Sequence, residues 1–292
     1  MNATSVQVPG ETSASVPRRT FDRTSDISKL DGYTSSGVEH RWTIYAPFLD
    51  LIPPGSPALD FGCGSLCESF ALVSRGIDVT SVDLDPSTMA SYRDNYVWPR
   101  PLRLLTFAQV ADGKLSDDTF RLICSFDVLE HVEEPGALLA MFERHLTNDG
   151  LLFLSVPNRF ALVEILSWAW WRLGLLRGRV FVPGEPHIQF KSPQEWRRLI
   201  EANGTLEVVA HEMAMGFFVI TWSAVVGLPA RAIDSIIRRQ FGRRTAVEGA
   251  VLHPRLMKCF SWLDRRMPRR MGVLSGSNLF VARRRAASAS RP

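Results

Sequence analysis

The sequence predicts an α/β fold, built on a doubly wound and mostly parallel sheet of seven strands with helices on both faces. Short apolar runs alternate with helix-like segments through the first half of the 292 residues, a pattern typical of parallel sheets. The first run leads into a tight turn, Gly62-Cys63-Gly64, and the second ends on Asp83. Asp83 lies 19 residues beyond Gly64, close to the ~20-residue spacing at which an acid meets a ribose in such sheets.

The expected elements follow these runs in chain order. Strands are predicted at Ala58–Phe61, Val79–Asp83, Leu102–Phe107, Leu122–Phe126, Leu151–Val156, Thr205–Ala210 and Asn278–Ala282. Helices are predicted at 66–75, 87–96, 135–146 and 192–202. Ser192 and Pro193 are typical residues for a helix start, and Asn203-Gly204 for a helix end. Thr147-Asn148-Asp149-Gly150 is expected to stop the helix before it and to turn the chain into the next strand.

The glycine turn departs from the dinucleotide fingerprint G-x-G-x-x-G, because Cys67 stands where the third glycine is expected. This departure disfavours a nicotinamide-dependent reductase, which stays open as an alternative function. Asp60 precedes the first glycine by two residues. A carboxylate beside the turn attracts a positively charged cofactor and repels a pyrophosphate.

Three segments in this order resemble the motifs of class I S-adenosylmethionine-dependent methyltransferases. They are Leu59-Asp60-Phe61-Gly62-Cys63-Gly64, Val82-Asp83-Leu84-Asp85 and Phe126-Asp127-Val128-Leu129-Glu130-His131-Val132. The small-molecule branch with ubiquinone-pathway-like enzymes is the most similar group. The resemblance implies a Rossmann-like domain, S-adenosyl-L-methionine as cofactor and methyl transfer as the activity.

The resemblance also implies roles for single residues. Asp60, Gly62, Cys63 and Gly64 would line the methionine part of the cofactor. Asp83 would bind the ribose hydroxyls, Leu84 would pack on adenine, and Phe126 would offer backbone contacts near the sulfonium. The adenine amine would be read by Gln109, which fits the usual spacing, or by Asp112, which is the nearest acid. Structural roles stay open for these positions: Asp60 and Asp83 could cap turns or helices, and Leu84 and Phe126 could belong to the core.

Two positions depart from the family pattern. Leu66 stands where a further glycine is common, and Phe120-Arg121 lacks the acid that usually opens the fourth strand. These departures motivate a third hypothesis, a catalytically degenerate protein that binds the cofactor or a membrane without transferring a methyl group.

His131 and His187 are the candidate general bases. Methyl transfer needs alignment and exclusion of water, and it needs a base only when the acceptor is a weakly acidic hydroxyl. A structural, hydrogen-bonded histidine is the alternative at each position. The acceptor is expected to be a small apolar or lipid-linked molecule methylated on oxygen.

The expected domain spans residues 21–283, with its core at 55–210 and 276–283. Residues 1–20 form a disordered tail and 284–292 a basic tail. Apolar helical insertions are expected at 159–186, after the fifth strand, and at 216–275, between the sixth and seventh strands. Trp168, Trp170 and Trp171 of the first insertion would wall an acceptor pocket, contact lipid or pack inside the protein.

Charge is divided unevenly along the chain. Residues 216–292 carry 15 Lys and Arg against 3 Asp and Glu, whereas residues 1–215 carry a net charge of −8. A basic end on an acidic body predicts an anionic partner, and peripheral contact with a membrane is preferred to nucleic acid. A solvated arginine-rich surface without a partner stays open as the alternative. Val156-Pro157-Asn158 does not match the Asn-Pro-Pro-aromatic motif of many base-modifying methyltransferases.

The four cysteines are Cys63, Cys67, Cys124 and Cys259. They show no metal-ligand pairing and no disulfide framework, so no metal is predicted. The N-terminal residues lack the pattern of a secretory signal. We therefore expect a cytoplasmic protein with peripheral contact at the inner face of a membrane.

Overall fold

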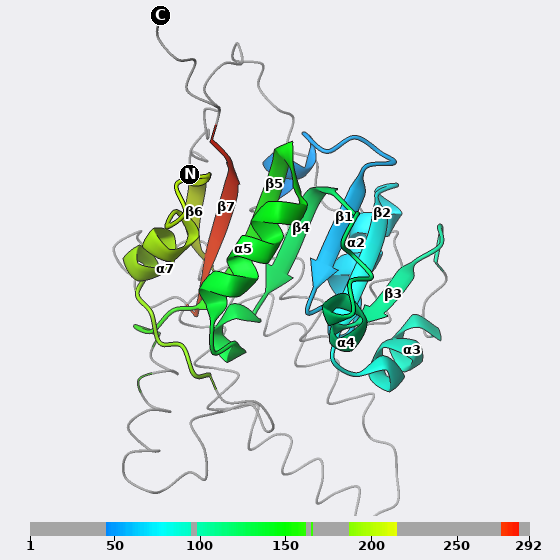
Figure 1. Ribbon diagram of the computed structural model, residues 1–292, viewed down its shortest axis with the longest axis horizontal. Coiled ribbons are helices and arrows are strands. Elements are labelled where there is room, and N and C mark those ends of the chain that lie inside the picture. Colours follow the sequence, from blue (N-terminus) through cyan, green and yellow to red (C-terminus); the bar gives the residue numbers. More distant parts are fainter. Residues whose placement is uncertain (1–44, 95–97, 162–164, 166–186, 215–275, 286–292) are drawn as a thin grey trace, which may run out of the picture.

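The computed structural model describes residues 45–94, 98–161, 165, 187–214 and 276–285 (Figure 1). Its strands are β1 (Pro57–Phe61), β2 (Asp78–Asp83), β3 (Arg103–Thr106), β4 (Phe120–Phe126), β5 (Leu146–Pro157), β6 (Leu206–Ala214) and β7 (Ser277–Arg284). Its helices are α2 (Cys67–Ser74), α3 (Pro86–Asp94), α4 (Phe107–Ala111), α5 (Pro135–His145) and α7 (Pro193–Ile200), with the 3-10 turn η2 at Leu129–His131. Residues 45–49 are also helical.

The seven strands form one sheet in the order β3-β2-β1-β4-β5-β7-β6. The first five are mutually parallel, whereas β7 runs antiparallel to both β5 and β6. Strand order reverses between β1 and β4, and ligands of open α/β sheets bind at the carboxyl ends of the strands at such a point. The predicted doubly wound and mostly parallel sheet is confirmed.

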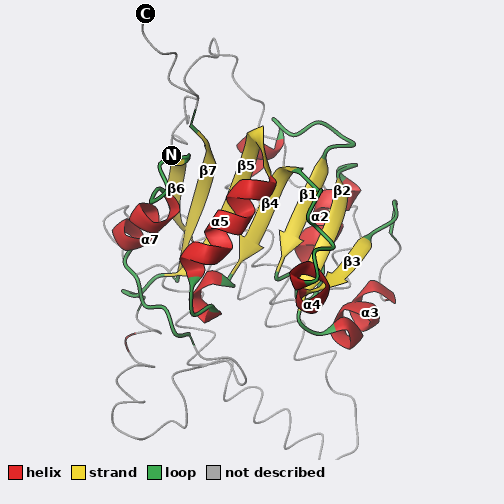
Figure 2. Cartoon of the chain, in the orientation of Figure 1, coloured by secondary structure: helices red, strands yellow, loops and turns green. Residues whose placement is uncertain are grey.

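Helices cover both faces of the sheet (Figure 2). On one face, α2 and the helical residues 45–49 pack on the sheet around Tyr45, Leu72 and Phe153. On the other face, α5 and α7 pack around Phe142, Trp196 and Leu152. Neighbouring residues of β5 therefore enter opposite layers, as the alternation of side chains along a strand requires.

Several element boundaries differ from the sequence prediction. Strand β3 ends at Thr106 because a capping box starts α4 there: Gln109 N–H donates to Thr106 Oγ1 at 3.2 Å, and Thr106 N–H donates to Gln109 Oε1 at 2.9 Å. Strand β5 begins at Leu146, directly after α5, and its register against β4 shifts between Phe120 and Leu122. Residues 147–150 thus lie within β5 and do not form a separate turn.

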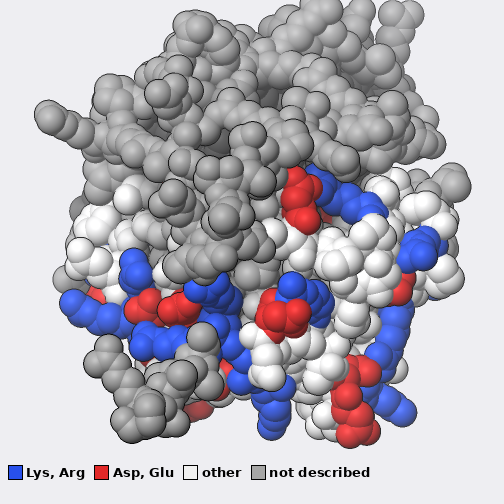
Figure 3. All heavy atoms as spheres, turned by 90° about the horizontal axis from the view of Figure 1, so that it is seen from above, with Lys and Arg blue, Asp and Glu red and all other residues white. Residues whose placement is uncertain are grey.

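The predicted insertions lie almost wholly outside the described residues, as do the tail 1–20, the three tryptophans of the first insertion and Cys259. Strand β7 extends to Arg284, one residue into the predicted basic tail. Among the described helices, none combines the length and apolar character needed to cross a bilayer. In the described part of the face seen in Figure 3, acidic and basic side chains are intermixed.

Candidate functional site

The glycine turn after β1 is held by the neighbouring strand β2. The backbone N–H groups of Gly62 and Cys63 both donate to the carbonyl oxygen of Val82, at 2.8 and 3.0 Å. Gly62 has φ 79°, and a Cβ placed there would lie 2.2 Å from Val128 Cγ2. Gly64 has φ 46°, and a Cβ there would meet no atom of the described residues within 4 Å. The turn is therefore closed by Val128 at Gly62 and open at Gly64.

Asp83 joins the two halves of the predicted nucleotide site. One carboxylate oxygen accepts the Gly64 N–H at 2.6 Å, and the other accepts the Leu84 N–H at 2.7 Å. A carboxylate has about four acceptor positions, so capacity remains for hydroxyl donors. Leu84 beside it is 62% exposed, which gives an apolar surface next to a carboxylate at the end of β2. The alternative prediction, an Asp83 that caps the following helix, is not supported, because Asp85 accepts the Ser87 N–H at the start of α3 at 2.9 Å.

Asp60 lies beneath the same turn and is 2% exposed. Ser69 of α2 donates its hydroxyl to Asp60 Oδ2 at 2.5 Å and lies 2.7 Å from the Ser81 hydroxyl oxygen. Burial raises the pKa of the Cys63 thiol, and the negative charges of Asp60 and Asp83 raise it further. The Cys63 thiol therefore stays protonated, and the turn lies in a field that favours cations.

Leu66, which replaces a common glycine, adopts the backbone conformation that a glycine would adopt. Its φ of 61° and ψ of 18° lie in the left-handed region, immediately before α2. The side chain is fully buried in a cluster with Cys63 and Met89. The local path of the chain is thus preserved, and burial of the leucine offsets the strain of the backbone.

The remaining predicted cofactor residues lie at the ends of β3 and β4. Gln109 is exposed and its side-chain carbonyl takes part in the α4 capping box, whereas Asp112 is exposed at the C-terminal end of α4. Phe126 is 8% exposed at the end of β4, with its ring 5.4 Å from that of Tyr45. Phe126 therefore has a core side chain, and only its backbone is suited to contact a ligand.

A strained residue, Asp127, follows Phe126. Its φ of 56° is left-handed, a conformation that aspartate tolerates better than most residues. Ser155 of β5 holds it twice: Asp127 N–H donates to Ser155 O at 2.9 Å, and the Ser155 hydroxyl donates to Asp127 Oδ1 at 2.7 Å. This fixed bend turns the chain into η2, which carries Glu130 and His131.

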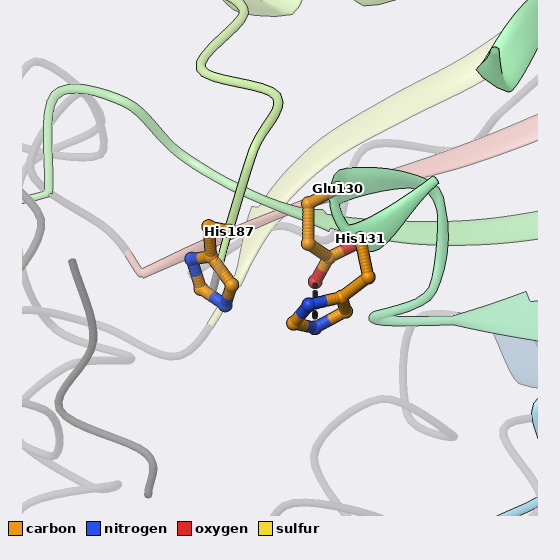
Figure 4. A group of neighbouring side chains, drawn as sticks. All are labelled: Glu130, His131 and His187. Atoms are coloured by element: carbon orange, nitrogen blue, oxygen red, sulfur yellow. Dashed lines mark ion pairs between the residues drawn. The ribbon is translucent and has the colours of Figure 1, made fainter. Parts of the chain in front are cut away.

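The two candidate bases lie side by side (Figure 4). The ring centroids of His131 and His187 are 5.0 Å apart, with the rings in an edge-to-face arrangement. Glu130 is fully buried, and its Oε1 lies 3.9 Å from Nε2 of His131. Ligand atoms of the three residues lie within 4.8 Å of one another, so this group could hold a divalent cation. No metal was predicted from the sequence, and only these three described residues form such a group.

Sequence reasoning predicted each histidine separately and missed what brings them together. Tyr45 packs under the end of β4 and donates its hydroxyl to Leu154 O at 2.7 Å. Asp127 and Gln189 shape the two segments that carry the histidines. The only signal for Asp127 was its place in the third motif, and Gln189 had none beyond its distance of two residues from His187.

The residues present fit S-adenosylmethionine. No described residue fills the space at Gly64, so a ligand can approach the backbone of the turn there. Asp60 and Asp83 impose a negative field on the turn. A cofactor with an ammonium and a sulfonium is favoured there, and a pyrophosphate is disfavoured. The pairing of Asp83 with exposed Leu84 suits a ribose next to an adenine.

Comparisons with known proteins relate the chain to methyltransferases. A family profile described as a methyltransferase domain matches residues 39–211, more than half of the chain. Curated relatives include the ubiquinone biosynthesis O-methyltransferase of Idiomarina loihiensis, 29% identical over 53% of this chain and 63% of its own length. The enzyme of that name from Pseudomonas aeruginosa UCBPP-PA14 is 27% identical over 46% of this chain and 63% of its own length. The chain thus matches less than two thirds of the length of each of these two relatives.

Solved structures show the same fold at low sequence identity. A cyclopropane synthase from Mycobacterium tuberculosis superposes with a TM-score of 0.54 at 15% identity, covering 89% of this chain and 95% of its own. A methyltransferase from Geobacter sulfurreducens, solved with S-adenosyl-L-homocysteine, gives a TM-score of 0.50 at 14% identity over 85% and 91% of the two chains. With the family match and the site geometry, these similarities place the chain in the methyltransferase domain family, within the class I S-adenosylmethionine-dependent superfamily.

Proposed function

We propose that this protein transfers a methyl group from S-adenosylmethionine to an oxygen atom of a small apolar or lipid-linked acceptor. The observation that carries the proposal is the hydrogen bond between the Gly64 N–H and Asp83, which joins two family motifs at the carboxyl edge of the sheet. Methylation on oxygen is supported by the relatives, which are O-methyltransferases of ubiquinone biosynthesis. The apolar acceptor is supported by the apolar segments of the sequence.

Roles in cofactor binding follow from the positions of the residues. Asp83 would accept the ribose hydroxyls, and Leu84 would cover adenine. Asp60 and the turn Gly62-Cys63-Gly64 would surround the methionine part, where the negative field favours its ammonium. Gln109 or Asp112 would reach the adenine amine, and the Phe126 backbone would lie near the sulfonium.

The chemical step needs little from the protein beyond alignment of the two substrates, exclusion of water and a proton acceptor. S-adenosylmethionine, when bound, supplies a methyl carbon already activated by the sulfonium. We assign His131 as the general base that takes the proton of the acceptor hydroxyl. The buried carboxylate of Glu130, 3.9 Å from His131 Nε2, would stabilise the imidazolium that this step forms. His187, whose ring centroid lies 5.0 Å from that of His131, would orient the acceptor oxygen or serve as the base itself.

Calorimetric titration with S-adenosylhomocysteine tests the cofactor site. Asp83→Asn removes the charge that accepts two backbone N–H groups, so we expect about 10- to 100-fold weaker binding, the usual value of hydrogen bonds to a charged group. Asp78→Asn is the matched control, because Asp78 starts the same strand and pairs with Arg100 at 2.8 Å, at the opposite end. Equal affinity in wild type and Asp83→Asn would remove the basis of the proposal.

The acceptor can be found by transfer of a tritiated methyl group from S-adenosylmethionine to fractionated cell extract. We expect the label in the apolar fraction. His131→Gln should lower the rate of methyl transfer and leave the affinity for the cofactor unchanged. Label in a macromolecular fraction would contradict the small-acceptor proposal.

The degenerate alternative loses its main motivation. Leu66 preserves the turn conformation, and Arg121 forms an ion pair with Asp149 at 2.9 Å that lowers the pKa of Asp149. Neither departure disturbs the described site. Binding of S-adenosylhomocysteine without transfer to any fraction would support this alternative over ours.

For partners and location, we propose peripheral contact of the basic C-terminal region, residues 216–292, with the inner face of a membrane, in a cytoplasmic setting. The support is the charge division of the sequence alone. Retention on anionic vesicles that weakens with salt, with no retention on RNA, is the expected result.

A further inference from the structure

The segment that carries His187 is attached to the η2 turn by backbone hydrogen bonds. The N–H groups of Ile188 and Gln189 both donate to the carbonyl oxygen of Glu130, at 2.8 and 3.0 Å. A carbonyl oxygen has two acceptor positions, and both are used here. These bonds place the chain directly after His187 against the turn that carries His131.

The Gln189 side chain adds the contacts that fix this arrangement. Its amide Nε2 donates to Val132 O at 3.0 Å and to Glu133 O at 3.1 Å. Its Oε1 accepts from Lys191 Nζ, which settles the orientation of the amide, since a flipped amide would bring donor against donor. The same side chain thus spans from the segment before α7 to the residues after η2.

Helix α7 anchors the other end of the segment. Ser192 and Glu195 form a capping box at its start, and Trp196 in its first turns is 1% exposed. Lys191 Nζ lies 5.5 Å from the centroid of the Trp196 ring. The position of Lys191, and through it the position of the Gln189 amide, is therefore set by a buried part of the fold.

We propose that Gln189 is a positioning residue, which holds His187 against His131 by clamping the segment 187–191 onto the turn 129–133. This inference rests on the proposed function, in which these histidines handle the acceptor. Loss of the clamp would leave cofactor binding intact, because the proposed cofactor residues Asp60 and Asp83 lie on β1 and β2, outside the two segments that Gln189 joins.

Gln189→Glu tests the proposal with almost no change of shape. The carboxylate cannot donate, and it places negative charge against two carbonyl oxygens. Gln194→Glu is the matched control, since it makes the same chemical change at an exposed position of α7. In histidine-labelled protein, we expect the nuclear Overhauser effect between the His131 and His187 ring protons to be lost in Gln189→Glu and kept in Gln194→Glu. Affinity for S-adenosylhomocysteine should be the same in both.

The rate test separates positioning from folding. For tritiated methyl transfer to the apolar extract fraction, the maximal rate of Gln189→Glu should fall about 10- to 100-fold, the scale of a misplacement of about 1 Å, with KM for S-adenosylmethionine unchanged. Gln189→Asn keeps an amide, and should recover part of the rate if its shorter side chain reaches one carbonyl. An intact ring contact together with a wild-type rate in Gln189→Glu would overturn the proposal.

The two hypotheses fail in different ways. If His131→Gln and His187→Gln transferred methyl groups at the wild-type rate, the assigned base would be wrong. The clamp would still be tested, because the contact between the two rings is measured in the Gln189 variants, which keep both histidines. If Gln189→Glu did not fold, Gln189→Met, which is isosteric and uncharged, would provide the same measurements. A Gln189→Met variant with the ring contact of the wild type would overturn the clamp on its own.

Discussion

Leu66 gives the sharpest test of the turn geometry, because the usual order of stability should be reversed there: the glycine variant should be more stable than the alanine variant. The side chain is 0% exposed, so Leu66→Ala should lower the free energy of unfolding by about 3 kcal/mol, within the range of buried leucine truncations. Leu66→Gly removes one further methyl group, worth under about 1 kcal/mol. It also removes about 1–2 kcal/mol of left-handed backbone strain, since φ is 61°.

We therefore expect Leu66→Gly to be about 1 kcal/mol more stable than Leu66→Ala. Leu72 is the matched control, because it is also 0% exposed but lies inside α2. There the order should be the usual one, with Leu72→Gly about 1 kcal/mol less stable than Leu72→Ala.

Urea denaturation followed by circular dichroism measures all four variants. The difference in stability between the alanine and glycine variants should have opposite signs at the two positions. All four variants should have equal m-values, which shows that each exposes the same amount of surface on unfolding. If Leu66→Ala were as stable as Leu66→Gly, the backbone at Leu66 would not be left-handed in solution, and the argument that the turn is preserved would fail.

Three further predictions concern the same fold. Gly62→Ala should lower stability by about 2–4 kcal/mol, the sum of backbone strain and overpacking, and Val128→Ala should recover the overpacking part in the double variant, as measured by thermal unfolding. The capping bond from Ser192 lowers the pKa of Glu195 from 4.5 to about 2; its contribution is full above pH 4.5 and is lost as the pH falls toward about 2, so wild type and Glu195→Gln should converge in stability over that window. Burial lowers the pKa of His211 below 6.5, so the folded state resists protonation and the wild type should lose stability as the pH falls below 6.5, whereas His211→Phe should not show this loss.

The sheet could be predicted because its determinants are local. Strand-length apolar runs such as Leu151–Val156, separated by turn residues, specify the parallel strands and their order of appearance. The predicted strand Leu102–Phe107 runs one residue too far and α4 is missing from the prediction, because the Thr106–Gln109 capping box ends β3 and starts a helix of only five residues. The β5 boundary could not be predicted, since the shift of register depends on pairing with β4.

The cofactor half of the site was more accessible to sequence reasoning than the acceptor half. Gly64 and Asp83 lie close in sequence to a recognisable turn, and their contact follows from the pairing of β1 with β2. The contact of His131 with His187 depends on backbone bonds between segments far apart in the chain. No periodicity or spacing encodes such a contact, and the same holds for the left-handed Asp127.

The two halves of the site are nevertheless one packed unit. Val128 fills the space that a side chain at Gly62 would need, and it directly follows Asp127, whose bend is fixed by Ser155 of β5. Glu130 and His131 come next in the same turn. Gly62 therefore lets the turn 127–131, which carries His131, pack against the end of β1, and in the proposed function it would also let the backbone approach the cofactor. If the proposed roles hold, a substitution that opens either contact should disturb both cofactor binding and proton transfer, because Val128 lies directly against the turn at Gly62.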